Sequence, residues 1–362
     1  MKILQVITSL ETGGAEMLVT NMIPMLIDLG HQVNLCVFNN KETPLLKKLR
    51  ENCPGITIYG LGNSFYNISY IPRLVKIIKN YDIIHSHNYS PQLFVAIANL
   101  FQHKTLVTTE HSTNNRRRTL RFFYYIDKWM YYQYNSVVCI SEIAEKRLKD
   151  YLKIRNNRVQ QICVINNGIN VDSFHKALPI DRKSINSTDN KFVVIMVAGF
   201  REAKDQDTLI RAIVRLPKDK FELWLVGDGV RRKEIERQIK EVHAEKQVKL
   251  LGLRFDVPSI LKSADVIVMS SHWEGLSLSN IEGMSVGKPF IASNVNGLRE
   301  ITQDYGILFP HEDDKSLAEI ILKLSNDKEY YNKVASQCYK RAQDFDLQKT
   351  TNSYSLLYNN LI

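Results

Sequence analysis

Short apolar stretches alternate with helix-forming stretches along almost the whole chain, and this alternation limits the possible folds more than any other feature. Stretches such as residues 136–140 and 192–198 are continuously apolar. Strands buried on both faces have this composition, and helices between them indicate a parallel sheet covered on both sides. In the first half, strands are predicted over residues 2–8, 32–38, 57–61, 83–87, 105–109 and 136–140, and helices over 15–29, 71–79, 92–101, 120–134 and 143–151.

A polar segment over residues 175–191 has no apolar periodicity and is predicted to be a linker. The alternation then resumes, so the chain of 362 residues is expected to form two α/β domains, over residues 1–180 and 190–345. Ligand clefts favour such domain interfaces. In the second half, strands are predicted over 192–198, 222–226, 248–251, 266–270, 289–292 and 306–309, and helices over 205–216, 231–245, 257–262, from 278 onward and to the C-terminus.

The composition, 44% hydrophobic and 24% charged, is that of a globular protein, and the sequence contains no apolar run of the length that spans a bilayer. The first residues are interpreted as a strand rather than a signal peptide, so a cytoplasmic location is expected. The five cysteines are scattered and form no Cys-x-x-Cys pair, which argues against a disulfide framework and a structural zinc site.

A net charge of +10 suggests a polyanionic partner, and the basic residues gather before an aromatic run. Arg116, Arg117, Arg118 and Arg121 precede and enter the predicted helix 120–134, which carries Phe, Tyr and Trp side chains. Such a segment could lie on an anionic membrane surface or stack on single-stranded nucleic acid. It could equally be a solvated helix whose aromatic side packs in the core.

Two glutamates, Glu274 and Glu282, flank a short Gly/Ser turn between a buried strand and a helix. Open α/β sheets bind ligands outside the carboxyl ends of their strands. Carboxylates beside small residues with free backbone N–H groups suit a ligand with hydroxyls and phosphates, such as a nucleotide sugar. Their spacing alone is also common in solvated helices, so the interpretation depends on the accompanying motifs.

Other loops at predicted strand ends carry polar groups. Gly199 ends a strand, and Arg201 and Lys204 follow it, where both could bind phosphate. Asp205 and Asp207 match an Asp-x-Asp metal motif, but their position at a helix start favours capping. Three further features are Gly14 at the start of the first helix, His85 and His87, interpreted as loop residues, and His111 after a strand.

Taken together, these motifs resemble those of the retaining GT-B glycosyltransferases of glycosyltransferase family four. The resemblance covers nearly the whole chain, and the order and spacing of its motifs are specific. Gly283 departs from the Ala that is usual after the second glutamate, and Ser277 and Ser279 replace apolar or small residues. The matching segments are residues 13–16, 138–142, 167–169, 199–204, 225–229, 251–254 and 274–282.

The resemblance implies two Rossmann-like domains facing a central cleft, with residues 1–180 binding the acceptor and 190–345 the donor. The helix at 346–362 would cross back to the first domain. Arg201 and Lys204 would hold the pyrophosphate in place of a metal, so neither a metal nor another cofactor is expected. His111, Arg201, Lys204 and Glu274 would be the catalytic residues. The remaining donor contacts would come from His111 and Glu274 (sugar), Glu282 (ribose), Gly14, Leu278 and Ser279 (phosphates), Leu253 and Arg254 (base), and Gly199.

The expected activity is retaining, metal-independent transfer of a sugar from a UDP-sugar to a hydroxyl of a lipid-linked glycan. The protein would act peripherally at the inner face of the cell membrane, in the assembly of capsule, exopolysaccharide or lipopolysaccharide. Arg116, Arg117, Arg118 and Arg121 would contact membrane or acceptor. Alternatives are a nucleotide-sugar epimerase or phosphorylase of the same fold and, more distantly, a basic nucleic-acid-binding protein.

Overall fold

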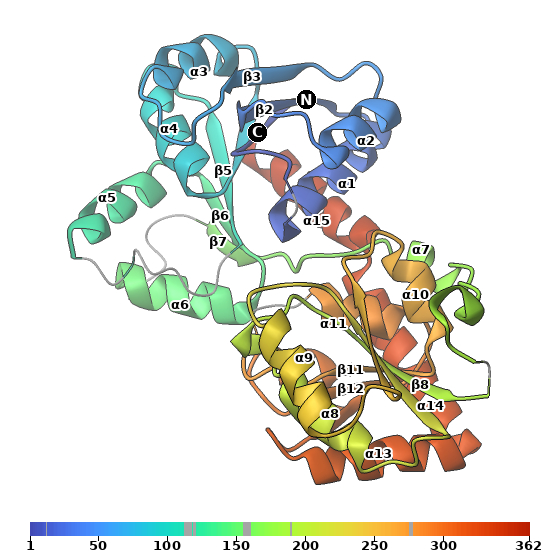
Figure 1. The fold of residues 1–362 in the computed structure, drawn as a ribbon. Helices are drawn as coiled ribbons and strands as arrows, with labels where there is room; N and C mark the ends of the chain where they lie inside the picture. The colour runs from blue at the N-terminus through green and yellow to red at the C-terminus, as the bar shows by residue number, and fades with distance from the viewer. Residues whose placement is uncertain (12, 112–117, 119–120, 155–160, 189, 275–277) are drawn as a thin grey trace. The chain divides into compact units, whose positions relative to one another are not determined.

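The computed structural model describes residues 1–11, 13–111, 118, 121–154, 161–188, 190–274 and 278–362 (Figure 1). The chain divides into two compact units. Unit 1 comprises residues Met1–Gly168 and Leu347–Ile362, and unit 2 comprises Ile169–Asp346. Among the described residues, no helix is both long and apolar enough to cross a membrane.

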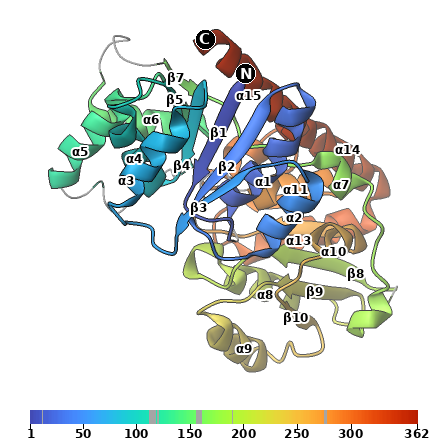
Figure 2. The ribbon, with the colours of Figure 1, turned by 90° about the horizontal axis from the view of Figure 1, so that it is seen from above.

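Unit 1 is built on a parallel sheet with the strand order β3-β2-β1-β4-β5-β6-β7, as the alternation predicts (Figure 2). From β1 the chain adds β2 and then β3 on one side, and from β4 it adds β5, β6 and β7 on the other. The crossovers on the two sides of the β1–β4 pair therefore lead in opposite directions. The strands are β1 (Lys2–Ile7), β2 (Gln32–Asn39), β3 (Ile58–Gly62), β4 (Ile83–His87), β5 (Thr105–Glu110), β6 (Ser136–Cys139) and β7 (Gln161–Val164).

Right-handed crossovers place the helices of unit 1 on both faces of this sheet. On β2, Leu35 belongs to the core that α1 and α15 share, whereas Phe38 packs on Tyr70 of α3 and Phe94 of α4, both at 5.6 Å between ring centres. The last helix, α15, packs on α1, which confirms the predicted return of the C-terminus. The helices are α1 (Gly14–Asp28), α2 (Pro44–Asn52), α3 (Tyr70–Ile78), α4 (Tyr89–Asn99), α5 (Arg121–Tyr132), α6 (Glu142–Leu152) and α15 (Leu347–Leu361).

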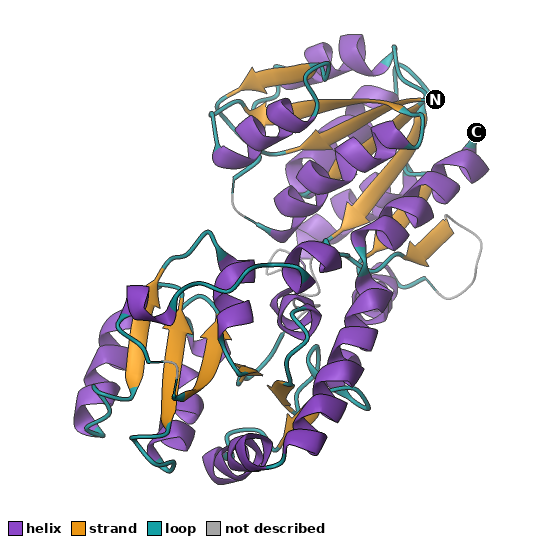
Figure 3. Cartoon of the chain, turned by 90° about the vertical axis from the view of Figure 1, so that its right-hand side faces the viewer, coloured by secondary structure: helices purple, strands orange, loops and turns teal. Residues whose placement is uncertain are grey.

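Unit 2 repeats the architecture of a sheet with helices packed against it (Figure 3). Its strand order is β10-β9-β8-β11-β12-β13, and the strands pair in parallel throughout the described residues. The strands are β8 (Phe192–Val197), β9 (Phe221–Val226), β10 (Val248–Gly252), β11 (Val266–Met269), β12 (Phe290–Ser293) and β13 (Ile307–Phe309). The helices are α7 (Val171–His175), α8 (Gln206–Val214), α9 (Arg232–Glu241), α10 (Val257–Ser263), α11 (Leu278–Ser285), α12 (Arg299–Thr302), α13 (Asp314–Asn326) and α14 (Lys328–Ala342).

The prediction of a linker over residues 175–191 is wrong, because the described part of this segment belongs to unit 2. The boundary between the units follows Gly168, earlier than the predicted domain end at residue 180. Arg182 fixes the segment to unit 2: its guanidinium donates to the backbone oxygen of Ser263 at 2.9 Å and to the carboxylate of Asp265 at 3.0 Å. The segment is therefore polar because it makes specific polar contacts.

Candidate functional site

The loops after β8 and β11, which carry Arg201, Lys204 and Glu274, lie at the point where the strand order of unit 2 reverses. β8 and β11 are neighbours, and their crossovers lead in opposite directions. Open α/β sheets bind ligands outside such a switch point. Ser270, just after β11, donates to the backbone oxygen of Asp205 in the loop after β8 at 2.6 Å, so the two loops are held together.

Lys204 and Glu274 form an ion pair across this switch point. The side chains are 21% and 11% exposed, so the pair is screened less than a surface pair. Ser271 donates to the same oxygen of Glu274, Oε1, at 2.8 Å. The sequence predicts both residues in the site, and the structure brings them into contact.

Arg201 lies in the same loop, and its side chain is exposed. The loop is anchored by the buried Phe200, whose backbone bonds to the turn after β9. That turn needs glycine: Gly227 has φ +137°, and an added Cβ would stand 2.1 Å from the backbone oxygen of Ala198. The predicted residue Gly199 follows β8, and an added Cβ there would lie 3.7 Å from the backbone oxygen of Asp228, an ordinary contact, so packing alone does not require glycine at this position.

Glu282 lies on α11, and burial raises the pKa of its carboxyl to about 7. The next residue on α11 is Gly283. An added Cβ there would stand 2.7 Å from the ring of Phe290 on β12, so packing at this position favours glycine. This contact gives a physical reason for the departure from Ala at that position. The predicted residues Leu278 and Ser279 form the first turn of α11, and residues 275–277 lie outside the described part of the chain.

The loop after β10 carries Leu253 and Arg254, which the sequence analysis expects to frame the base. Leu253 is exposed, and the guanidinium of Arg254 is paired with Asp256, with Nε at 2.7 Å from Oδ1. The side chain of Arg254 is thus already engaged. Phe255, which the sequence analysis did not select, is 95% exposed in this loop. In the sequence, the only signal is an aromatic residue placed directly after Gly252, Leu253 and Arg254 in a loop.

In unit 1 the strand order reverses between β1 and β4, and buried histidines lie at this edge. The strand predicted over residues 83–87 is confirmed as β4, so the separate interpretation of His85 and His87 as loop residues is wrong: both lie in this strand and are fully buried. His87 Nδ1 lies 3.0 Å from His111 Nε2, and His87 Nε2 lies 2.7 Å from Gln5 Oε1. Hydrogen bonding to partners distant in sequence allows polar rings in a strand.

The network continues into the last helix. His85 Nδ1 bonds to the hydroxyl of Tyr358 at 2.6 Å, and His85 Nε2 bonds to Thr109 Oγ1 at 2.8 Å. The Gln5 amide donates to the same hydroxyl of Tyr358 at 3.3 Å. The packing of α15 on unit 1 thus supports the strand that carries His87.

These contacts define the protonation of His111. Because Gln5 Oε1 accepts from His87 Nε2, His87 Nδ1 is left to accept from His111 Nε2. His111 Nδ1 then has a free lone pair, and among the described residues this buried atom has no hydrogen-bond partner. Burial lowers the pKa of His111 to about 4, so the ring is neutral near pH 7. His111 can therefore accept a hydrogen bond from a hydroxyl.

The predicted phosphate contact Gly14 opens α1 after β1, and its neighbour Gly13 caps the helix without a side chain. The first N–H groups of a helix attract anions. Glu16 lies in the same turn, and its carboxylate accepts from Asn88 at 3.3 Å. Burial raises the pKa of Glu16. Gly14 is exposed at this helix start, as a backbone contact to a ligand requires.

The expectation that Arg118 faces a membrane is wrong. Its side chain is 10% exposed and pairs with Glu110 at 2.8 Å, and its guanidinium lies 5.2 Å from the ring centre of Tyr151. Tyr131 donates to the same carboxylate. Arg116 and Arg117 lie outside the described residues, and of Arg121 only the backbone is described, as the start of α5.

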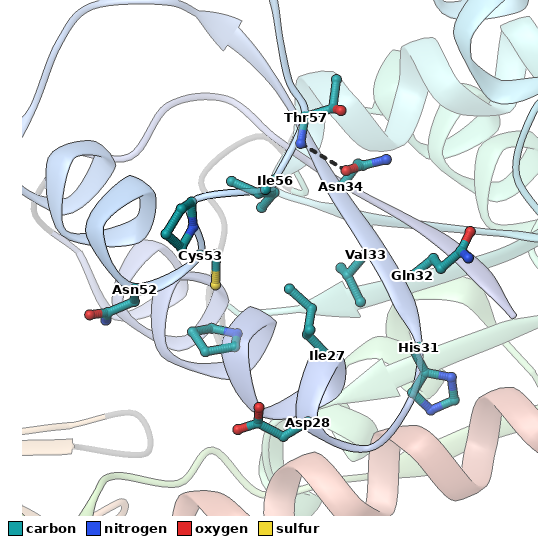
Figure 4. Close-up of a pocket in the computed structure, with 13 residues that line it drawn as sticks. Ile27, Asp28, His31, Gln32, Val33, Asn34, Asn52, Cys53, Ile56 and Thr57 are labelled. Atoms are coloured by element: carbon teal, nitrogen blue, oxygen red, sulfur yellow. Dashed lines mark hydrogen bonds between the residues drawn. The ribbon is translucent and has the colours of Figure 1, made fainter.

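A further hollow of unit 1, about 610 Å³, lies at the amino end of β2, opposite the carboxyl edge that carries the histidines (Figure 4). It is lined by residues at the start of β2 and the end of α1, including Gln32, Val33 and Ile27. Asn34 accepts from the backbone of Thr57 beside it at 2.9 Å. None of the predicted site residues lines this hollow, so its size does not make it the candidate site.

The fold and these loops define a GT-B glycosyltransferase, and comparisons with known proteins agree. The family model "Glycosyl transferases group 1" matches residues 179–341, and "Glycosyltransferase Family 4" matches residues 12–173. The chain therefore belongs to the group 1, family 4 glycosyltransferases. This is the family that the sequence motifs resemble.

The individual relatives share little sequence identity with this chain, but the similarity covers most of it. The chain is 26% identical over 320 residues to the UDP-Gal:α-D-GlcNAc-diphosphoundecaprenol α-1,3-galactosyltransferase of Escherichia coli, covering 80% of this chain and 78% of that protein. It is 27% identical over 364 residues to an uncharacterized glycosyltransferase of Methanocaldococcus jannaschii, covering 96% and 95%. The crystal structure of HepE from Anabaena in complex with UDP superposes with a TM-score of 0.84 at 21% identity, covering 99% and 100%.

Proposed function

We propose that the protein is a retaining glycosyltransferase that transfers a sugar from a UDP-sugar to a hydroxyl of a lipid-linked glycan in cell-surface polysaccharide synthesis. The observation that carries the proposal is the convergence of Lys204, Glu274 and Arg201 at the switch point of unit 2. Unit 2 binds the donor and unit 1 the acceptor. The choice of UDP is supported by two relatives, the galactosyltransferase named for UDP-Gal and the UDP complex of HepE.

Arg201 and Lys204 bind the diphosphate and stabilise the negative charge that grows on it as the bond to the sugar breaks. Because these two cations supply the charge, the proposed reaction uses no metal. Glu282 accepts from the ribose hydroxyls and Glu274 from a hydroxyl of the donor sugar. Within unit 2, Leu278 and Ser279 offer backbone N–H groups to phosphates beside Gly199, and Leu253 and Arg254 bond the base through their main chain.

The reaction is a front-face displacement. The bond between the anomeric carbon and the diphosphate oxygen breaks, and the acceptor oxygen bonds to that carbon on the same face. The acceptor proton passes to the leaving phosphate oxygen, so no enzyme nucleophile is required. Neutral His111 accepts a hydrogen bond from a sugar hydroxyl through its free Nδ1 lone pair.

A screen of nucleotides tests the donor class. UDP, GDP, ADP and their common sugars are compared by thermal shift and calorimetry on wild type, Glu282→Ala and, as a matched control, the exposed Glu245→Ala. Only the UDP family should stabilise the wild type and the control, and Glu282→Ala should lose the effect. Stabilisation by another family, or by none, would contradict the proposed donor.

The stereochemistry is tested with the donor from that screen. NMR of the product should show the anomeric configuration of the donor, and the inverted configuration would contradict retention. Incubation with donor alone is the second arm, because an epimerase would convert the sugar without any acceptor. Transfer should appear only when an acceptor hydroxyl is added.

The proposed lipid-linked acceptor is supported by an aromatic stripe on α5. Phe122, Tyr125, Trp129 and Tyr132 are 73%, 74%, 37% and 40% exposed. Their spacing of three or four residues places them on one face of the helix. Exposed aromatics on a helix with basic residues beside it suit an interfacial position at a membrane. This stripe replaces Arg118 as the surface that would contact a bilayer.

Vesicle sedimentation tests the stripe. The triple variant Phe122→Ser, Tyr125→Ser, Trp129→Ser should lose binding to vesicles that contain anionic phospholipid. The matched control replaces three exposed aromatics of the same unit, Phe65, Tyr66 and Phe101, by Ser and should bind like wild type. If both variants bound vesicles as well as wild type, α5 would not be the membrane contact, and the proposal for the donor site would not be affected.

A further inference from the structure

A cluster of possible metal ligands lies at the carboxyl edge of unit 2, on loops after two strands. His272 follows β11, and His311 and Glu312 follow β13. His272 Nδ1 lies 2.8 Å from His311 Nε2 and 3.4 Å from Glu312 Oε1, and the last two atoms are 3.9 Å apart. Ligand atoms about 2.0–2.2 Å from a tetrahedral zinc ion are about 3.4 Å apart, so the separation of His272 and Glu312 already fits, and the other two need shifts of about 0.5 Å.

Asp205 gives an independent indication of a cation. It is 2% exposed, and its Oδ1 accepts from the backbone N–H of Thr208 at 3.1 Å as the N-cap of α8. Its Oδ2 is buried without a hydrogen-bond partner among the described residues and lies 3.8 Å from His272 Nδ1. An unsatisfied buried carboxylate oxygen is costly, and a cation beside His272 would satisfy it.

We propose that His272, His311 and Glu312 bind one divalent transition-metal ion of the zinc type, with Asp205 supplying the second negative charge on the buried side. Two imidazoles and carboxylates select Zn²⁺, Co²⁺ or Ni²⁺ rather than Mg²⁺ or Ca²⁺. The two carboxylates balance the charge of the ion. A hollow of about 670 Å³ that Asp205, His272 and Glu312 line gives the ion access from solvent.

The ion has a structural role. Asp205 directly follows Lys204, and His272 precedes Glu274 by two residues, so the ion would tie together the loops that present this pair. The proposal separates the two aspartates of the Asp-x-Asp motif: Asp207 pairs with Arg231 at 2.6 Å, whereas Asp205 Oδ2 lies 3.8 Å from His272 Nδ1. None of the four residues is assigned a role in the proposed transfer reaction.

Metal binding to the full-length chain tests the proposal. Protein stripped with a chelator is titrated with Zn²⁺, and bound metal is measured by elemental analysis together with the melting temperature. One ion per chain and a higher melting temperature are expected. Co²⁺ in place of Zn²⁺ should give the visible absorption of a site with nitrogen and oxygen ligands. Absence of bound Zn²⁺ in the wild type would overturn the proposal.

Variants locate the ion. His311→Ala should weaken binding about 100-fold and abolish the cobalt spectrum. His311 is 39% exposed at its side chain, so the variant should still fold. The matched control His243→Ala, another exposed histidine of unit 2, should bind like wild type. Equal zinc affinity in both variants would overturn the assignment. UDP binding is measured separately on stripped protein, so failure of the metal site and failure of the donor site give different results.

Discussion

The carboxyl edges of the two parallel sheets differ in how they handle charge. In unit 2 the edge is ionic, with Lys204 paired to Glu274 and the exposed Arg201 beside them. In unit 1 the buried rings of His85 and His87 and the adjoining His111 form a hydrogen-bonded network, and burial lowers the pKa of each. The same topology thus carries charged groups at one edge, as the proposed diphosphate site requires, and uncharged hydrogen-bonding groups at the other.

The difference originates in how each edge satisfies its polar groups. At the ionic edge, the charged groups lie in loops after β8 and β11, where water or ligand phosphates can solvate them. At the neutral edge the polar rings lie within β4, where an unpaired charge would be costly. Gln5, Thr109 and Tyr358 solvate the histidines with neutral groups. A positive charge would therefore be tolerated far better at the first edge than at the second.

The largest effect should follow from removing the cation of the ionic edge. Lys204→Met deletes a charge proposed to stabilise the leaving diphosphate and leaves Glu274 without its counter-ion. Loss of one such group costs on the order of 10²- to 10³-fold in kcat. Steady-state kinetics should show this fall in both kcat and kcat/KM. The matched control Arg215→Met removes an exposed cation paired with Asp314 and should retain wild-type rates. Unchanged kcat for Lys204→Met would show that the charged edge is not catalytic.

The next effect concerns the neutral edge and acid. Folding lowers the pKa of His111 from 6.5 to about 4, so the unfolded chain binds more protons between these values. The stability that neutral His111 provides is complete above pH 6.5 and is lost as pH falls toward 4. This single group should contribute a loss on the order of 2 kcal/mol in the free energy of unfolding near pH 4.5.

Thermal unfolding at pH 7 and pH 4.5 measures that loss. His111→Asn keeps a polar side chain that does not titrate, so the fall in melting temperature with acid should be smaller than in wild type. The exposed His243→Asn is the control and should keep the wild-type fall. If His111→Asn and wild type lose the same number of degrees, protonation of His111 is not what separates the two edges.

The sequence predicts the sheets well because buried parallel strands are continuously apolar, and the site loops follow from their positions at strand ends. It fails where a polar residue finds a distant partner. His85 and His87 were expected in a loop, yet their partners, such as Gln5 and Tyr358, lie at the two ends of the chain. Arg182 within the supposed linker similarly pairs with Asp265. The elements α2 and β7 were not predicted: α2 carries Lys47, Lys48 and Arg50 among its leucines, and β7 has only two strongly apolar residues, Ile162 and Val164.

Glu282 is the exception that sharpens the comparison, because it lies at the ionic edge yet is only partly ionised near neutral pH. Burial raises the pKa of its carboxyl to about 7, whereas hydrogen bonds from ribose hydroxyls favour the ionised form. Donor affinity should therefore rise about tenfold from pH 6 to pH 8 as the carboxyl loses its proton. Calorimetry with a UDP-sugar measures this, because a diphosphate esterified at both ends does not titrate in that range. Glu282→Gln should bind weakly with no such slope, while the exposed Glu245→Gln should keep it. A slope that persists in Glu282→Gln would mean that another group of the ionic edge titrates, and that burial at Glu282 does not control nucleotide binding.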